Sequence, residues 1–270
     1  MSSSLFTAIR RAAALLLIAG SFSAMAGDKV GVVLMHGKYG TAEHVQSLAE
    51  ALRSRGYLVV TPDMPWSRSR AYDRSLDEGH REIDILVDQL HKIGATRIVI
   101  AGHSMGANVA LGYAATHESP DAVIALGPGQ TVESRAFYDA LGISVDKARK
   151  MIDEGHAEQP TEFADLHLGK VTTTKTSARI DLSYFDPAGL ANMPRTVMRI
   201  GIPLLWTVGD LDQNMLDRGS SYAFDLAQPN SLNRYQVVHA DHMGTPDASR
   251  DVVLRWLDVV FPNRSNANPR

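Results

Sequence analysis

The chain has 270 residues, a formal net charge of −3 at neutral pH and no cysteine. This slightly acidic balance argues against a nucleic-acid-binding surface, which requires clustered Lys and Arg. The absence of cysteine excludes disulfides, thiolate nucleophiles and cysteine-ligated metals. A chain of this length can bury the core of one large domain.

Residues 1–26 have the pattern of a signal peptide. Arg10 and Arg11 precede an apolar run over residues 12–20, and Ala24 and Ala26 form a signal-peptidase site. The run is shorter than the about 20 residues of a membrane helix. We therefore expect cleavage after Ala26, a periplasmic or secreted protein, and no stable membrane anchor afterwards. The bare arginine pair leaves export by the twin-arginine route open.

Short runs rich in Val and Ile then alternate with helical patterns, which predicts a parallel sheet with helices on its faces. The expected strands are residues 30–35, 57–61, 97–101, 122–126, 203–208 and 234–238. The expected helices, with apolar residues three and four apart, are 42–55, 76–93, 105–117, 216–227 and 246–260.

The alternation breaks between Gly129 and Ile200. This stretch has helical patterning over 132–154 and a Thr-rich patch over 171–177 with no strong strand signal. It predicts a mainly helical cap insert, at about residues 130–200, over the edge of the sheet. The main domain then covers 27–262, and residues 263–270 form a polar tail.

The sequence Gly102-His103-Ser104-Met105-Gly106 joins an expected strand to an expected helix. Gly-x-Ser-x-Gly in this context is typical of a nucleophile elbow, in which a side chain at either glycine would collide with the neighbouring strand or helix. Ser104 is therefore the candidate nucleophile. The alternative is that Ser104 only caps the helix.

An activated serine needs a base and an acid that orients the base. Asp210 and Asp212 follow the expected strand 203–208, and His239 and His242 follow the expected strand 234–238. Parallel sheets place their sites at these carboxyl ends. Serine, aspartate and histidine occur in the order expected for an α/β-hydrolase.

The chain resembles the α/β-hydrolase family over nearly all of residues 30–261. The resemblance implies a minimal core of about six strands, with Asp212, at the end of a Gly-x-x-Asp turn, as the acid and His242 as the base. An acid two residues beyond Asp210 can also project toward the loop of His242. Asp210 is expected to accept backbone N–H bonds within its turn.

The run His36-Gly37-Lys38-Tyr39-Gly40 resembles the His-Gly-x-x-Gly loop of that family. The resemblance implies an oxyanion hole made by the backbone N–H groups of Lys38 and Met105.

Together these features predict an exported serine hydrolase that cleaves a carboxylic ester, thioester or related small acyl substrate without a cofactor. The alternatives are a peptidase, perhydrolase or acyltransferase on the same fold, or a binding protein that has lost catalysis. His36 and His103 are expected to be structural. A metal site around His239 and His242 is not favoured, because no third cluster with ligand spacing accompanies them.

Overall fold

The computed structural model of the protein describes residues 27–263. The expected signal peptide, residues 1–26, and residues 264–270 of the expected tail lie outside the described residues.

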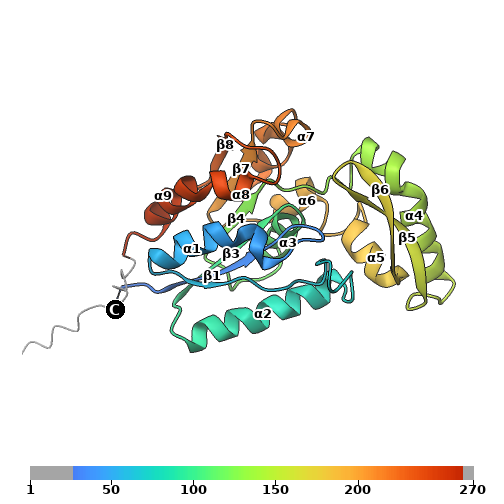
Figure 1. Cartoon of the computed structure of the whole chain (residues 1–270), viewed down its shortest axis with the longest axis horizontal. Coiled ribbons are helices and arrows are strands. Elements are labelled where there is room, and N and C mark those ends of the chain that lie inside the picture. Colours follow the sequence, from blue (N-terminus) through green and yellow to red (C-terminus); the bar gives the residue numbers. More distant parts are fainter. Residues whose placement is uncertain (1–26, 264–270) are drawn as a thin grey trace, which may run out of the picture.

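Within residues 27–263, six parallel strands form the central sheet, in the order β2-β1-β3-β4-β7-β8; all of them except β2 are labelled in Figure 1. They are β1 (Val30–Met35), β2 (Leu58–Val60), β3 (Arg97–His103), β4 (Ala122–Leu126), β7 (Leu204–Gly209) and β8 (Arg234–Val238). This confirms the predicted α/β-hydrolase sheet. The order reverses between β1 and β3, where open parallel sheets form their ligand crevice.

Helices cover both faces of the sheet. One face carries the 3₁₀ turn η1 (Ala42–Val45), α1 (Gln46–Ser54) and α9 (Arg250–Val260). The other face carries α2 (Leu76–Lys92), α3 (Met105–Ala114) and α6 (Met193–Val197). Successive strand residues such as Val32 and Val33 point into these two separate cores, as the period of two requires.

The prediction of one helix over residues 216–227 is wrong. The structure has a short α7 (Gln213–Leu216) and two 3₁₀ turns, η2 (Ser220–Tyr222) and η3 (Phe224–Leu226). Gly219, with a φ of 64°, interrupts the helical hydrogen bonding between them. The expected helix 246–260 is divided into α8 (Thr245–Ala248) and α9.

The cap contains α4 (Arg135–Asp153), the strands β5 (Pro160–His167) and β6 (Lys170–Ser177), and α5 (Ala178–Phe185). These elements lie together at one end of the sheet (Figure 1). The prediction of no strong strand in the insert is wrong, because β5 and β6 form an antiparallel hairpin. Its two-residue turn, Leu168-Gly169, has positive φ at both residues, as in a type I′ turn. Leucine rarely marks such a turn, whereas the β-branched threonines of β6 favour a strand.

Residues 27–263 show neither a candidate membrane span nor a candidate metal cluster. No helix in this part of the chain is long and apolar enough to cross a membrane. The same residues contain no group of three or more His, Cys, Asp or Glu side chains that could hold a metal ion.

Asp181, on α5, is a buried carboxyl whose two oxygens have no hydrogen-bond partner among the described residues. Burial, and then the charge of Asp165, raises its pKa to about 8, although Lys38 and Lys147 oppose the shift. At neutral pH the folded protein therefore holds a proton that the unfolded chain has released.

We expect the protein to become less stable as pH rises, because folding then requires Asp181 to take up a proton. Asp titrates near pH 4 when unfolded, so the free energy of unfolding should fall between about pH 4 and pH 8 and then level off, by on the order of a few kcal/mol. Asp181→Asn, which mimics the protonated carboxyl, should flatten this fall. Urea unfolding at pH 5 and pH 8.5 measures it, and an equal fall in the variant would contradict the prediction.

Candidate active site

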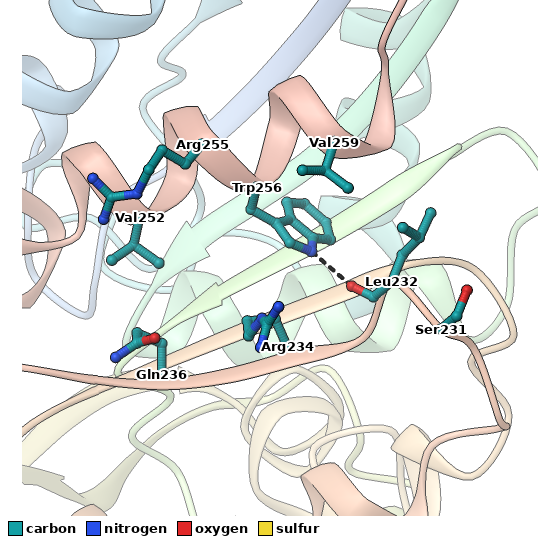
Figure 2. Close-up of a pocket in the computed structure, with 8 residues that line it drawn as sticks. All are labelled: Ser231, Leu232, Arg234, Gln236, Val252, Arg255, Trp256 and Val259. Carbon is teal, nitrogen blue, oxygen red and sulfur yellow. Dashed lines mark hydrogen bonds between the residues drawn. The ribbon is translucent and has the colours of Figure 1, made fainter.

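The structure contains two cavities of interest. The larger, about 820 Å³, is lined by Ser104 and His242 and by loops at the carboxyl ends of the strands. The smaller, about 290 Å³, lies between β8 and α9, where Trp256 Nε1 donates to the carbonyl of Leu232 at 2.7 Å (Figure 2). Among the described residues, no histidine or carboxylate lines the smaller cavity. The larger one is therefore the candidate active site.

Ser104 occupies a strained turn between β3 and α3. Its φ of 54° and ψ of −119° are unfavourable for a residue with a side chain. A Cβ at Gly102 would lie 2.2 Å from the carbonyl oxygen of Gly106, and one at Gly106 would lie 2.6 Å from that of His36. Both glycines are thus required by close backbone approach, as the motif predicts. The hydroxyl of Ser104 makes no capping bond to α3, so the capping alternative finds no support.

Three predicted residues come together at the carboxyl ends of β3, β7 and β8. Ser104 Oγ lies 2.9 Å from His242 Nε2, and His242 Nδ1 lies 2.6 Å from Asp212 Oδ2. A carboxylate can only accept from the Nδ1–H, so a neutral ring keeps its Nε2 lone pair for the serine hydroxyl. The geometry allows proton transfer from Ser104 to His242.

Asp210 and His239 form a separate pair. Asp210 Oδ1 accepts the N–H of Ala240 at 3.1 Å, and its Oδ2 lies 2.7 Å from His239 Nδ1. The hydrogen bond lowers the pKa of Asp210 and raises that of His239. His239 is 85% exposed and does not line the cavity. The backbone N–H that Asp210 accepts here therefore belongs to Ala240, in the loop after β8, and not to its own turn as expected.

His103 and His36 make backbone contacts beside the site. His103 Nε2–H donates to the carbonyl of His242 at 2.8 Å, and burial lowers the pKa of His103 to about 3. His36 Nε2 accepts the N–H of Met64 at 3.1 Å while its Nδ1–H donates to the carbonyl of Gly37 at 2.8 Å. Burial also lowers the pKa of His36. Both rings bond backbone groups and hold loops in place, which agrees with the structural role predicted for them.

The backbone N–H groups of Lys38 and Met105 have no hydrogen-bond acceptor among the described residues. The loop that carries Lys38 lies against the elbow, since a Cβ at Gly37 would be 3.0 Å from Cβ of Ser104. Free N–H groups beside a nucleophile can stabilise a negative oxygen that forms there.

Sequence reasoning missed Gly129 and Asn108. A Cβ at Gly129 would lie 2.8 Å from Ser104 Oγ and 3.4 Å from His242 Cε1, so only glycine leaves room for the nucleophile. Asn108 Oδ1 accepts the N–H groups of Gly129 at 3.1 Å and Gln130 at 3.2 Å. The available signal was Asn108 itself, a polar residue one turn after the serine in an otherwise apolar helix. A buried amide needs hydrogen-bond partners, so it indicates a nearby loop that it holds.

The rest of the cavity wall mixes apolar and charged side chains. Phe137 is the cap aromatic that lines it, whereas Phe163, Tyr184 and Phe185 are buried in the cores. The carboxylates of the wall are Asp212 and the exposed Glu43. Further lining residues are Leu166, Leu168, Met215, Met243, Arg68 and Arg218.

Comparison with known proteins gives one family match. The sequence model of the family described as serine aminopeptidase, S33, matches residues 28–243. A comparison with curated proteins finds no match to this sequence.

Several solved structures share the fold. Paleococcus ferrophilus monoacylglycerol lipase is 20% identical, with 87% of this chain and 96% of that chain aligned and a TM-score of 0.65. Est1E from Butyrivibrio proteoclasticus is 18% identical, with 86% and 89% aligned and a TM-score of 0.57. The thioesterase domain from the curacin biosynthetic pathway is 17% identical, with 85% and 91% aligned and a TM-score of 0.55. At these identities the likeness is one of fold.

Proposed function

Because the chain belongs to the serine aminopeptidase S33 family and is an α/β-hydrolase, we propose that Ser104, His242 and Asp212 form the catalytic triad of an esterase-like enzyme. The proposed substrate is a carboxylic ester, a thioester or a related small acyl compound. The observation that carries the proposal is the unbroken series of contacts from Asp212 through His242 to Ser104, at 2.6 and 2.9 Å.

In the proposed mechanism, Ser104 Oγ attacks the substrate carbonyl carbon while its proton passes to His242 Nε2. The N–H groups of Lys38 and Met105 bind the oxyanion that forms. Collapse of this intermediate expels the alcohol or thiol, which takes the proton from His242, and leaves an acyl group on Ser104. Water then attacks the acyl carbon while its proton passes to His242, and His242 returns that proton to Ser104 Oγ as the acyl–oxygen bond breaks and the acid leaves. Asp212 holds the ring tautomer and stabilises its positive charge in both halves.

The cavity favours acyl esters over peptides with a free amino terminus. An aminopeptidase must bind a substrate ammonium group, for which a carboxylate is the natural partner. Of the two carboxylates in the wall, Asp212 is engaged by His242 and Glu43 is exposed. Apolar side chains such as Phe137 and Met215 are suited to an acyl chain. The names of the fold neighbours, a monoacylglycerol lipase and a thioesterase domain among them, agree with this choice.

A substrate panel tests the reaction class. Purified protein is assayed with p-nitrophenyl esters of graded acyl length, with acyl thioesters, and with aminoacyl p-nitroanilides. We expect hydrolysis of esters or thioesters with kcat/KM well above that for any anilide. A preference for aminoacyl anilides would identify a peptidase instead, and failure of all substrates and of fluorophosphonate labelling would favour a binding protein.

We also propose that the enzyme is exported and acts in the periplasm or outside the cell. Cleavage after Ala26 should leave Gly27 as the first residue of the exported protein, because small residues precede that bond at both positions that signal peptidase reads. Intact-mass analysis of the protein recovered outside the cytoplasm measures this. A chain there that still begins at Met1 would contradict cleavage.

A further inference from the structure

We infer that Asp165, on the cap hairpin, is a positioning residue that fixes the Lys38 backbone N–H in the oxyanion hole. The inference rests on the proposed function, since it concerns the same site. It assigns the cap a part in catalysis besides covering the cavity.

The contacts of Asp165 are unusual in joining one cap carboxylate to two consecutive residues of the loop after β1. Asp165 is completely buried. Its Oδ1 accepts from Lys38 Nζ at 2.5 Å, and its Oδ2 accepts from Tyr39 OH at 2.6 Å. Lys38 Nζ donates also to the carbonyl of Leu166, the next residue of β5, at 2.9 Å. The hairpin therefore holds the side chains on both sides of the peptide bond between Lys38 and Tyr39.

The backbone of this loop needs such support. Tyr39 has a φ of 52°, a left-handed conformation that is unfavourable for a residue with a side chain. Its N–H is held by the carbonyl of Trp66 at 2.8 Å, whereas the N–H of Lys38 has no acceptor within residues 27–263. The direction of the Lys38 N–H depends on the two torsion angles that flank its peptide unit, ψ of Gly37 and φ of Lys38. Anchoring the Lys38 ammonium and the Tyr39 hydroxyl to one rigid acceptor restrains those angles.

A buried ion pair by itself contributes little to the free energy of unfolding. The side chains of Lys38 and Asp165 are 2% and 0% exposed, so both groups lose their hydration, and the pair recovers this cost only with precise geometry. Burial lowers the pKa of Lys38, although Asp165 opposes the shift. The ring of Phe185, centred 4.8 Å from Nζ, adds a further directed contact. Such a pair is best suited to fixing an orientation. The loop that it orients, which carries Lys38, lies beside Ser104.

The test compares three variants with the wild type at pH 6. Asp165→Asn keeps the shape of the side chain but removes the charge that holds Lys38. Tyr39→Phe keeps the ring but removes the hydroxyl, with its contacts to Asp165 and Thr174. Asp181→Asn is the matched control, because it alters another buried carboxyl of the cap that has no hydrogen bond to the loop.

Each variant is assayed for kcat and KM on the best ester and for affinity for a boronic acid, which forms a tetrahedral adduct on the serine with an oxygen in the hole. Loss of one oxyanion donor costs about 10²–10³ in kcat in other hydrolases, and a displaced donor should cost less. For Asp165→Asn we expect kcat to fall roughly 10- to 100-fold, boronate affinity to fall in parallel and KM to stay within about twofold. Tyr39→Phe should show a smaller loss of the same kind, and Asp181→Asn no loss.

Wild-type kcat and boronate affinity in Asp165→Asn, with the protein folded, would overturn the inference. If Asp165→Asn does not fold, Tyr39→Phe decides: a kcat loss with unchanged KM supports the inference, and wild-type kinetics overturn it. Failure of the proposed function is distinguishable, because the wild type itself would then hydrolyse no ester and bind no boronate.

Discussion

Ser104→Ala should lower kcat on the best ester by on the order of 10³-fold or more and abolish fluorophosphonate labelling. The substitution removes the attacking oxygen but leaves both elbow glycines, the oxyanion donors and the fold in place. The melting temperature should therefore stay close to that of the wild type. Steady-state kinetics and a thermal melt on the same preparation measure both effects.

Ser231→Ala is the matched control for this experiment. Ser231 lines the smaller cavity, where no histidine can activate it (Figure 2). This variant should keep wild-type kcat and labelling. Retention of most activity in folded Ser104→Ala would end the proposal that Ser104 is the nucleophile.

Asp212→Asn should lower kcat by about 10²- to 10⁴-fold, because an amide in place of the carboxylate leaves His242 in the wrong tautomer. Asp210→Asn changes a carboxylate only two residues away, in the turn that holds Ala240 and His239. We expect it to keep most of kcat and to lower the melting temperature slightly. Kinetics and thermal melts of the two variants decide between them.

Substitution of the two histidines compares the Asp212–His242 pair with the Asp210–His239 pair independently. His242→Ala should remove activity, and His239→Ala should retain it, because His242 Nε2 lies 2.9 Å from Ser104 Oγ whereas His239 pairs with Asp210. A large loss of kcat confined to Asp210→Asn and His239→Ala would show that acid and base had been assigned to the wrong pair.

The residues brought together at the site could be predicted because they follow strands with strong local signals. The runs of Val and Ile in β1 and β3 are buried on both faces, which makes them readable without tertiary information. Register then aligns the strand ends, with His103 beside Leu126 and Gly209 beside Val238. This alignment brings Asp212 and His242 to Ser104. Their spacing after the strands was visible in the sequence.

Other parts of the fold depend on contacts that local patterns do not reveal. The hairpin turn at Leu168 lacks the Asn-Gly signal, and residues 171–177, which form most of β6, have only a Thr-rich pattern. The pairing of Asp165 with Lys38 joins residues 127 positions apart, so neither residue alone indicates the other. Residues 216–227 have helical spacing, yet Gly219 adopts a left-handed conformation that ends the helix. In each case tertiary packing, or a backbone angle, overrides the local pattern.

The central claim is that Ser104 carries the acyl group during turnover, and peptide mapping of a trapped intermediate tests it most directly. The wild-type protein is mixed with an excess of a slowly hydrolysed p-nitrophenyl ester, quenched in acid within one turnover, digested and analysed by mass spectrometry. We predict an added acyl mass on the peptide that contains Ser104, located on that serine by fragmentation and absent from a sample left to turn over completely. Acyl mass on another side chain, or none during a measured burst of p-nitrophenol, would contradict the mechanism.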